Sequence, residues 1–208
     1  MQKRGWFISI EGVDGAGKTT LIEQLLKHLR AEYPVVSIRE PGGTVVSEKI
    51  RELLLDVRSE GMRAKTEALL YGAARSQVTE EIIAPALAEG KVVIADRFAD
   101  STIAYQGYGR GLDIDFLKGL NRLCTAGNNP DLTILLDIDP EEGQKRRTGH
   151  KPDRLEKEGL EFQQRVRRGY LELQAEEPSR IKLIDANLSQ GEILSRALQI
   201  IKNRLLMG

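Results

Sequence analysis

The stretch FISIEGVDGAGKTT, residues 7–20, decides the fold, because an apolar run leads into a glycine-rich loop and then into a helix-like segment. Residues 12–19 fit the pattern G-x-x-x-x-G-K-T, in which backbone N–H groups and the start of the next helix face phosphate oxygens. In this pattern Lys18 contacts the terminal phosphates and the hydroxyl of Thr19 binds Mg²⁺. The stretch therefore predicts a loop that holds a nucleoside triphosphate. Its expected binding residues are Gly12, Val13, Asp14, Gly15, Ala16, Gly17, Lys18, Thr19 and Thr20.

Short runs of branched aliphatic residues predict the strands of a sheet. They cover residues 7–10, 35–38, 92–95, 133–138 and 181–184. Near-continuous apolar runs are typical of strands covered on both faces, and amphipathic segments alternate with them. This order predicts an α/β, P-loop NTPase fold: a five-stranded parallel sheet with helices on both faces and a mobile lid. No repeat or linker divides the chain, so residues 1–208 are expected to form a single domain.

Net charge and cysteine content indicate which kinds of substrate and cellular location to expect. The 208 residues include 31 Lys and Arg and 31 Asp and Glu, so the formal net charge is zero. Proteins that act on nucleic acid or anionic membranes usually have a basic excess, so we expect small-molecule substrates instead. Cys124 is the one cysteine, which indicates a reducing compartment. The apolar stretch near the N-terminus is too short for a signal peptide or a membrane span, so a cytoplasmic location is expected.

The segments that follow the other strands distinguish between classes of nucleotide-binding protein. A GTPase would normally contain the guanine-binding motif N-K-x-D, and the sequence has none. Instead the chain has REPGGT at 39–44, DRF at 96–98 and STIAYQG at 101–107, followed by a basic run near residue 146. Together with the phosphate loop, and in this order, these motifs resemble thymidylate kinases over essentially the whole chain. The resemblance implies transfer of the γ-phosphoryl group of ATP to dTMP, giving dTDP and ADP for dTTP biosynthesis. It also implies Mg²⁺ as cofactor and a homodimer.

The chemistry of such a transfer agrees with the residue types present. A phosphate monoester has a second pKa of about 6, so the acceptor is already ionised at neutral pH and needs no strong general base. The difficulty is electrostatic, because two unit charges about 4 Å apart repel by about 4 kcal/mol at an effective dielectric constant near 20. We therefore expect fixed cations around a metal ion at the site.

Arg97 follows a predicted strand directly, where open α/β sheets bind their ligands. The resemblance implies that Arg97 holds the acceptor phosphate and bridges it to the donor; the alternative is a surface salt bridge with Asp96. Asp96 itself is the favoured residue, beside Thr19, for orienting Mg²⁺, and Asp137 is the alternative.

Tyr71 and Arg75 are one helical turn apart and share a face. The resemblance places the ring against thymine and the guanidinium in a hydrogen bond to the base. The alternative is that Tyr71 belongs to the core. Further residues that the resemblance implies for binding the acceptor nucleotide are Arg39, Glu40, Ser101, Thr102, Tyr105 and Gln106. The alternative for Ser101 is that it caps the start of a helix.

Cations from a lid complete the expected site. Asp14 is an acid within the phosphate loop, and the resemblance directs it toward the sugar 3′-hydroxyl. Some family members have an arginine at the next position, which is Gly15 here, and such members tend to lack lid arginines.

The basic segment 142–159 is expected to be the lid, and its candidates for catalysis are Arg146, Arg147 and Arg154. The alternative for this segment is a solvated run of charges.

Two other functions stay open from the sequence alone. One is a kinase of the same fold for a different pyrimidine nucleotide or for a deoxynucleoside. The other is a nucleotide-bound regulatory protein without turnover.

Overall fold

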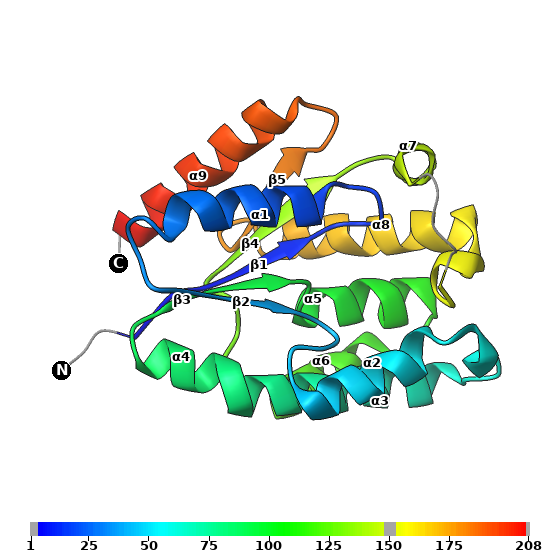
Figure 1. Cartoon of the computed structure of the whole chain (residues 1–208). Coiled ribbons are helices and arrows are strands. Elements are labelled where there is room, and N and C mark those ends of the chain that lie inside the picture. The colour runs from blue at the N-terminus through cyan, green and yellow to red at the C-terminus, as the bar shows by residue number, and fades with distance from the viewer. Residues whose placement is uncertain (1–3, 148–152, 207–208) are drawn as a thin grey trace.

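The computed structural model describes residues 4–147 and 153–206. At its centre lies a parallel sheet in the order β2-β3-β1-β4-β5 (Figure 1). The strands are β1 Phe7–Glu11, β2 Val35–Arg39, β3 Val92–Asp96, β4 Leu132–Asp137 and β5 Ile181–Asp185. This confirms the predicted five-stranded parallel sheet, with each strand within one residue of its expected bounds.

Helices cover both faces of the sheet (Figure 1). On one face lie α1 Lys18–Leu29 and α9 Gln190–Leu206, which contact each other. The other face is covered by α4 Ala84–Ala88, α5 Ala99–Thr102 and α8 Leu160–Glu176. Beyond it lie α2 Val45–Leu55, α3 Ala64–Val78 and α6 Ile114–Thr125. Two π-helical segments, η2 Thr79–Ile83 and η3 Ile103–Gly109, extend α3 and α5. Among the described helices, none is both long and apolar enough to cross a bilayer.

The two faces of β1 explain how the core holds the sheet. Ile8 and Ile10 pack in one apolar cluster with Leu21 and Leu25 of α1. Phe7 packs in a second cluster, where its ring contacts that of Phe98 edge-on with the two ring centres 4.8 Å apart. Both sides of the strand are fully buried, which is why its sequence is apolar at nearly every position.

The helix that follows β1 begins without a side-chain cap. Gly17 occupies the N-cap position in the left-handed region, with φ of 91°. The first N–H groups of a helix have no intrahelical partner, and here no side chain replaces one. The start of α1 therefore presents its free N–H groups and positive dipole end to the phosphate loop, residues 12–19.

The first part of the predicted lid is helical. Helix α7, Pro140–Arg146, is capped by Asp139, and the 3₁₀ turn Glu156–Glu158 leads into α8. Residues 148–152, in the middle of the predicted lid, lie outside the described residues, as do 1–3 and 207–208. Helix α7 packs closely on the phosphate loop, because a Cβ atom at Gly15 would lie 2.1 Å from the carbonyl oxygen of Gly143. A side chain at position 15 has no room in this arrangement.

Candidate active site

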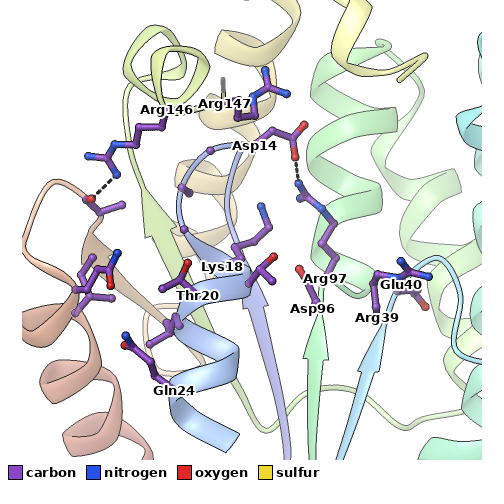
Figure 2. Close-up of a pocket in the computed structure, with 18 of the residues that line it drawn as sticks. Asp14, Lys18, Thr20, Gln24, Arg39, Glu40, Asp96, Arg97, Arg146 and Arg147 are labelled. Atoms are coloured by element: carbon purple, nitrogen blue, oxygen red, sulfur yellow. Dashed lines mark hydrogen bonds and ion pairs between the residues drawn. The ribbon is translucent and has the colours of Figure 1, made fainter. Parts of the chain in front are cut away.

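A pocket of about 570 Å³ opens at the carboxyl ends of the strands (Figure 2). The phosphate loop forms its floor, and Asp96 and Arg97 enter from the end of β3. Arg146 and Arg147 at the end of α7 line the opposite side. Charged groups that are scattered along the sequence thus meet above the start of α1, as the strand-end argument predicts.

The phosphate loop has the backbone conformation that its glycines permit. Gly12, Gly15 and Gly17 have φ of 140°, 82° and 91°. Lys18 Nζ lies under the loop and donates to the carbonyl oxygens of Gly12 and Val13, at 3.0 Å each. Burial, followed by the positive charge of Arg97, lowers the pKa of Lys18 to about 8. A bound polyphosphate would add negative charge beside this buried cation and favour its protonated form.

Arg97 is held in a strained backbone conformation, with φ of 70°. Its guanidinium donates to the carbonyl of Gly12 at 2.9 Å and to the hydroxyl of Tyr170 at 3.2 Å, and forms a salt bridge with Asp14. Its charge also lies 5.0 Å from the ring centre of Tyr105. Left-handed conformations of non-glycine residues persist where surrounding contacts impose them, and they concentrate at functional sites.

Asp14 is ionised in this setting. Burial raises the pKa of its carboxyl, but the charges of Arg97, Lys18 and Arg147 outweigh burial and bring the pKa below the usual value. The carboxylate accepts a hydrogen bond from Arg97 and lies 3.5 Å from the hydroxyl of Tyr105. An acid within a phosphate-binding loop is thereby neutralised by Lys18 of the same loop and by Arg97 and Arg147 from distant segments.

A second, narrower pocket of about 210 Å³ adjoins the first. It is lined by Tyr71, Arg75, Ser101, Thr102, Tyr105 and Gln106. Two arginines, Arg51 and Arg97, line both pockets together with three acidic residues, Asp14, Glu40 and Glu156, so the two pockets share a charged wall. The residues expected to hold an acceptor nucleotide are thus gathered in a space of their own, next to the phosphate loop.

Arg75 is more completely engaged by the protein than the sequence suggested. Its Nε and Nη2 donate to the carboxylate of Glu40 at 2.5–3.0 Å, and Nη2 also donates to the carbonyl of Phe98. Its Nη1 donates to Thr102 Oγ1 at 2.8 Å and to Asn121 Oδ1 at 2.7 Å. These bonds use all five N–H groups of the guanidinium. Glu40 is therefore the partner of buried Arg75, and a hydrogen bond from Arg75 to a base would require one of these bonds to be exchanged.

Several other side chains that were expected to contact the acceptor nucleotide form hydrogen bonds or ion pairs within the protein instead. Ser101 Oγ donates to Glu11 Oε2 at 2.6 Å and is 2.7 Å from the hydroxyl of Tyr170. The amide of Gln106 donates to Glu67 at 2.9 Å. Arg39 is half-exposed at the rim of the first pocket and pairs with Glu48 at 2.9 Å. Tyr71 and Tyr105 line the second pocket, and burial raises the pKa of both phenols, so they act as neutral groups.

The three lid arginines occupy different places. Arg146 donates to the carbonyl of Ala186 at 2.8 Å, at the outer end of the first pocket (Figure 2). Arg147 lines the same pocket and pairs with Glu156 at 2.8 Å. Arg154 is buried away from the phosphate loop, where it donates to Glu67 at 2.6 Å and to the carbonyl of Leu54. Of the three, Arg146 and Arg147 adjoin the first pocket in this conformation.

Two side chains fit a Mg²⁺ ion held together with phosphate. Thr19 and Asp96 both line the first pocket, whereas the alternative, Asp137, forms two hydrogen bonds with Arg167 at 2.8 and 2.9 Å. Within the described residues, no three His, Cys, Asp or Glu side chains gather as a metal site. A hydroxyl and one carboxylate suit Mg²⁺ because this ion retains waters and takes substrate phosphate oxygens as ligands.

The structure adds functional candidates that the sequence reasoning missed. Glu11, fully buried, accepts hydrogen bonds from the backbone N–H of Phe98 and from Tyr170. Arg51 of α2 stands between the two pockets and donates to the carbonyl of Pro41. Glu67 lies one turn before Tyr71 on α3, a position that the helical spacing could have indicated. Arg51 and Tyr170 lie in helices outside the quoted motifs, and no local pattern distinguishes them.

Comparison with known proteins agrees with this site. The sequence model of the family described as thymidylate kinase matches residues 10–197. The thymidylate kinase of Caldanaerobacter subterraneus subsp. tengcongensis is 50% identical over 200 residues, covering 96% of this chain and 94% of that protein. That of Lactobacillus delbrueckii subsp. bulgaricus is 45% identical over 206 residues, covering 96% and 97%. The crystal structure of thymidylate kinase from Ehrlichia chaffeensis has a TM-score of 0.78 and 34% identity, covering 95% of this chain and 99% of that one. The chain therefore belongs to the thymidylate kinase family.

Proposed function

We propose that the protein transfers the γ-phosphoryl group of ATP to dTMP, giving dTDP and ADP. The observation that supports this most directly is the shared wall of the two pockets. ATP occupies the larger pocket, with its phosphates on the loop around Lys18, and dTMP occupies the smaller one. The γ-phosphoryl group and the acceptor phosphate then meet at Arg97 and Arg51, the cations that line both pockets.

The chain's own residues lower the cost of bringing two polyanions together. Lys18 contributes a buried charge beneath the donor phosphates, and the N–H groups of α1 lie behind it. Arg97 is fixed by Gly12, Tyr170 and Asp14 before any substrate binds, so it needs little reorganisation. Thr19 and Asp96, which line the larger pocket, would hold Mg²⁺ together with phosphate oxygens, and the ion would supply positive charge beside the transferred group.

Arg146 and Arg147 are the lid arginines placed to complete the cationic site. Both line the pocket assigned to ATP, and Gly15 leaves no space for a cation in the loop itself. Arg154 would have to leave Glu67 to take part. Separate Arg146→Ala, Arg147→Ala and Arg154→Ala variants, compared by kcat at saturating ATP and dTMP, test this assignment. Unchanged kcat in all three would refute a catalytic lid.

The acceptor is tested by steady-state rates with dTMP, dUMP, dCMP and thymidine at fixed ATP. We expect the highest kcat/KM with dTMP and no phosphorylation of thymidine, because Arg97 and Arg51 require an acceptor phosphate. Calorimetric titration with dTMP and a non-hydrolysable ATP analogue should give two independent sites. Faster turnover of thymidine, or mutually exclusive binding of the two nucleotides, would contradict the proposal.

We also propose a homodimer that acts in the cytoplasm. The outer helices α2, α3 and α6 expose apolar side chains that a monomer would leave in water, and α2 and α3 pack against each other. These are Leu53, Leu69, Phe116 and Leu123, of which Leu123 is 78% exposed. Light scattering should give twice the chain mass, and Leu69→Asp with Leu123→Asp should give a monomer. A monomeric wild-type protein at micromolar concentration would exclude the dimer.

A further inference from the structure

Glu67 is a fully buried carboxylate to which the motifs assign no role. It lies on α3 one turn before Tyr71 and two turns before Arg75, on the helix face that borders the second pocket. Its carboxylate accepts hydrogen bonds from Gln106 Nε2 at 2.9 Å, from Arg110 at 3.0 and 3.2 Å, and from Arg154 at 2.6 Å. Burial raises the pKa of Glu67, but the bonds from Arg110 and Gln106 outweigh burial and lower it, so the group is ionised.

An ionised carboxylate can only accept hydrogen bonds, and this fixes the orientation of the neighbouring amide. The atom of Gln106 that faces Glu67 has to be the NH₂ group, because a carbonyl oxygen there would meet another acceptor. Gln106 lines the second pocket and Glu67 does not. Of the two ends of the Gln106 amide, the carbonyl oxygen Oε1 is therefore the one left for a ligand in that pocket.

Two of the other polar side chains around the pocket, Arg75 and Thr102, already form hydrogen bonds within the protein. The five N–H groups of Arg75 are bonded to the protein, and Thr102 Oγ1 accepts one of them. By contrast, Gln106 Oε1 accepts no hydrogen bond from the described part of the chain, and it is not among the buried unpaired atoms there. Because Gln106 lines the second pocket, this oxygen is an acceptor that a ligand there can use.

The hydrogen-bond acceptor Oε1 of Gln106 matches one edge of a pyrimidine base. Thymine and uracil have an N–H donor at ring position 3, whereas cytosine has an acceptor there. An oxygen fixed toward the pocket would pair with N3–H of thymine or uracil and would face the lone pair of cytosine. Buried acceptors that face each other cost about as much as a lost hydrogen bond or more.

We propose that Glu67 is a positioning residue that sets base selectivity: by holding the NH₂ group of Gln106, it presents Oε1 to the pocket and excludes cytosine. This rests on the assignment of the second pocket to the acceptor nucleotide. Glu67 does not touch the substrate, and its effect passes through the amide of Gln106.

The test is Glu67→Gln, whose amide can donate as well as accept and so lets Gln106 turn over. The measured quantities are kcat/KM for dTMP, dUMP and dCMP with the purified full-length protein and ATP. We expect the dTMP/dCMP ratio to fall about tenfold, the equivalent of one net hydrogen bond. The dTMP/dUMP ratio should stay the same, because both bases have N3–H. An unchanged dTMP/dCMP ratio would overturn the inference, and so would equal losses for all three nucleotides.

Two further variants separate positioning from general damage. Arg110→Gln also removes an ion pair from Glu67 but leaves the bond to Gln106, so it should keep the wild-type dTMP/dCMP ratio. In a Gln106→Leu background, Glu67→Gln should have no further effect on that ratio. A persisting effect there would show that Glu67 acts by another route. If wild-type protein does not phosphorylate dTMP at all, the proposed function itself fails, which is a different result from an unchanged ratio.

A measurement on the wild-type protein covers the case in which Glu67→Gln does not fold. The side-chain NH₂ signal of Gln106, identified by its loss in Gln106→Leu, should exchange slowly with solvent, because one proton is bonded to a buried carboxylate. Adding dTMP should leave that protection in place. Rapid exchange of both protons in the free protein would overturn the inference.

Discussion

Replacing Arg75 by methionine should destabilise the protein far more than it weakens acceptor binding. Arg75 and Glu40 have side chains only 1% and 2% exposed, and the shortest bond between them is 2.5 Å. In Arg75→Met, the carboxylate of Glu40 stays buried without a cation, and Thr102, Asn121 and the carbonyl of Phe98 lose a donor.

The size of the effect follows from this burial. Removing one partner of a buried ion pair typically costs about 3–5 kcal/mol, because the other charge stays uncompensated. For a domain of this length, that corresponds to a fall in Tm of about 6–20 °C. Burial raises the pKa of Glu40, and the charge of Arg75 opposes the rise. Without Arg75 the folded-state pKa is raised further, so the deficit should grow as pH rises from about 5 to 8.

Urea unfolding followed by the fluorescence of Trp6, the single tryptophan, measures the loss, since Trp6 packs against the core. The double variant Glu40→Met with Arg75→Met removes both charges and should recover most of the stability. A stability loss under 1 kcal/mol for Arg75→Met, together with a large rise in KM for dTMP, would refute the reasoning. It would show that Arg75 serves the base rather than Glu40.

Three further changes test other parts of the site. Lys18→Ala should lower turnover by roughly 10³-fold while the protein stays folded, because in the described part of the chain the Lys18 amine donates to two loop carbonyls and to no other group. Unchanged turnover would contradict its role. Burial raises the pKa of Glu11 from 4.5 to about 7. Protonated Glu11 therefore contributes folding stability that is fully present below pH 4.5 and is lost as the pH rises through 7. Wild type should therefore lose up to about 3 kcal/mol of stability between pH 5 and 8 that Glu11→Gln does not lose, as urea unfolding across that range would reveal. Gly15→Ala should be less stable than Gly17→Ala, since both have positive φ but only the first would strike Gly143; equal unfolding midpoints would argue against tight packing of α7 on the loop.

Much of the fold was predictable because its signals are local. Fully buried strands such as Phe7–Glu11 have to be apolar at nearly every position, and this pattern is visible in the sequence. The phosphate loop needs glycines where φ is positive, so its pattern could be recognised before the structure. Helical spacing also placed Tyr71 and Arg75 on one face, and both line the second pocket.

What stayed hidden depends on contacts between distant segments. Arg75 and Glu40 are 35 positions apart, and Arg154 and Glu67 are 87 apart, so no local pattern states that these charges pair. In the structure, Ser101 donates a hydrogen bond to Glu11 and Gln106 donates one to Glu67. The sequence could only place both residues near the acceptor nucleotide.

The sequence by itself determined the parallel sheet, the phosphate loop and the set of cations available to a phosphoryl-transfer site. Only the tertiary structure decided which of those cations face the pockets and which are already neutralised by buried carboxylates. The physical reason is that a buried charge takes its partner from whatever the fold brings within about 3 Å, and chain separation does not limit that choice.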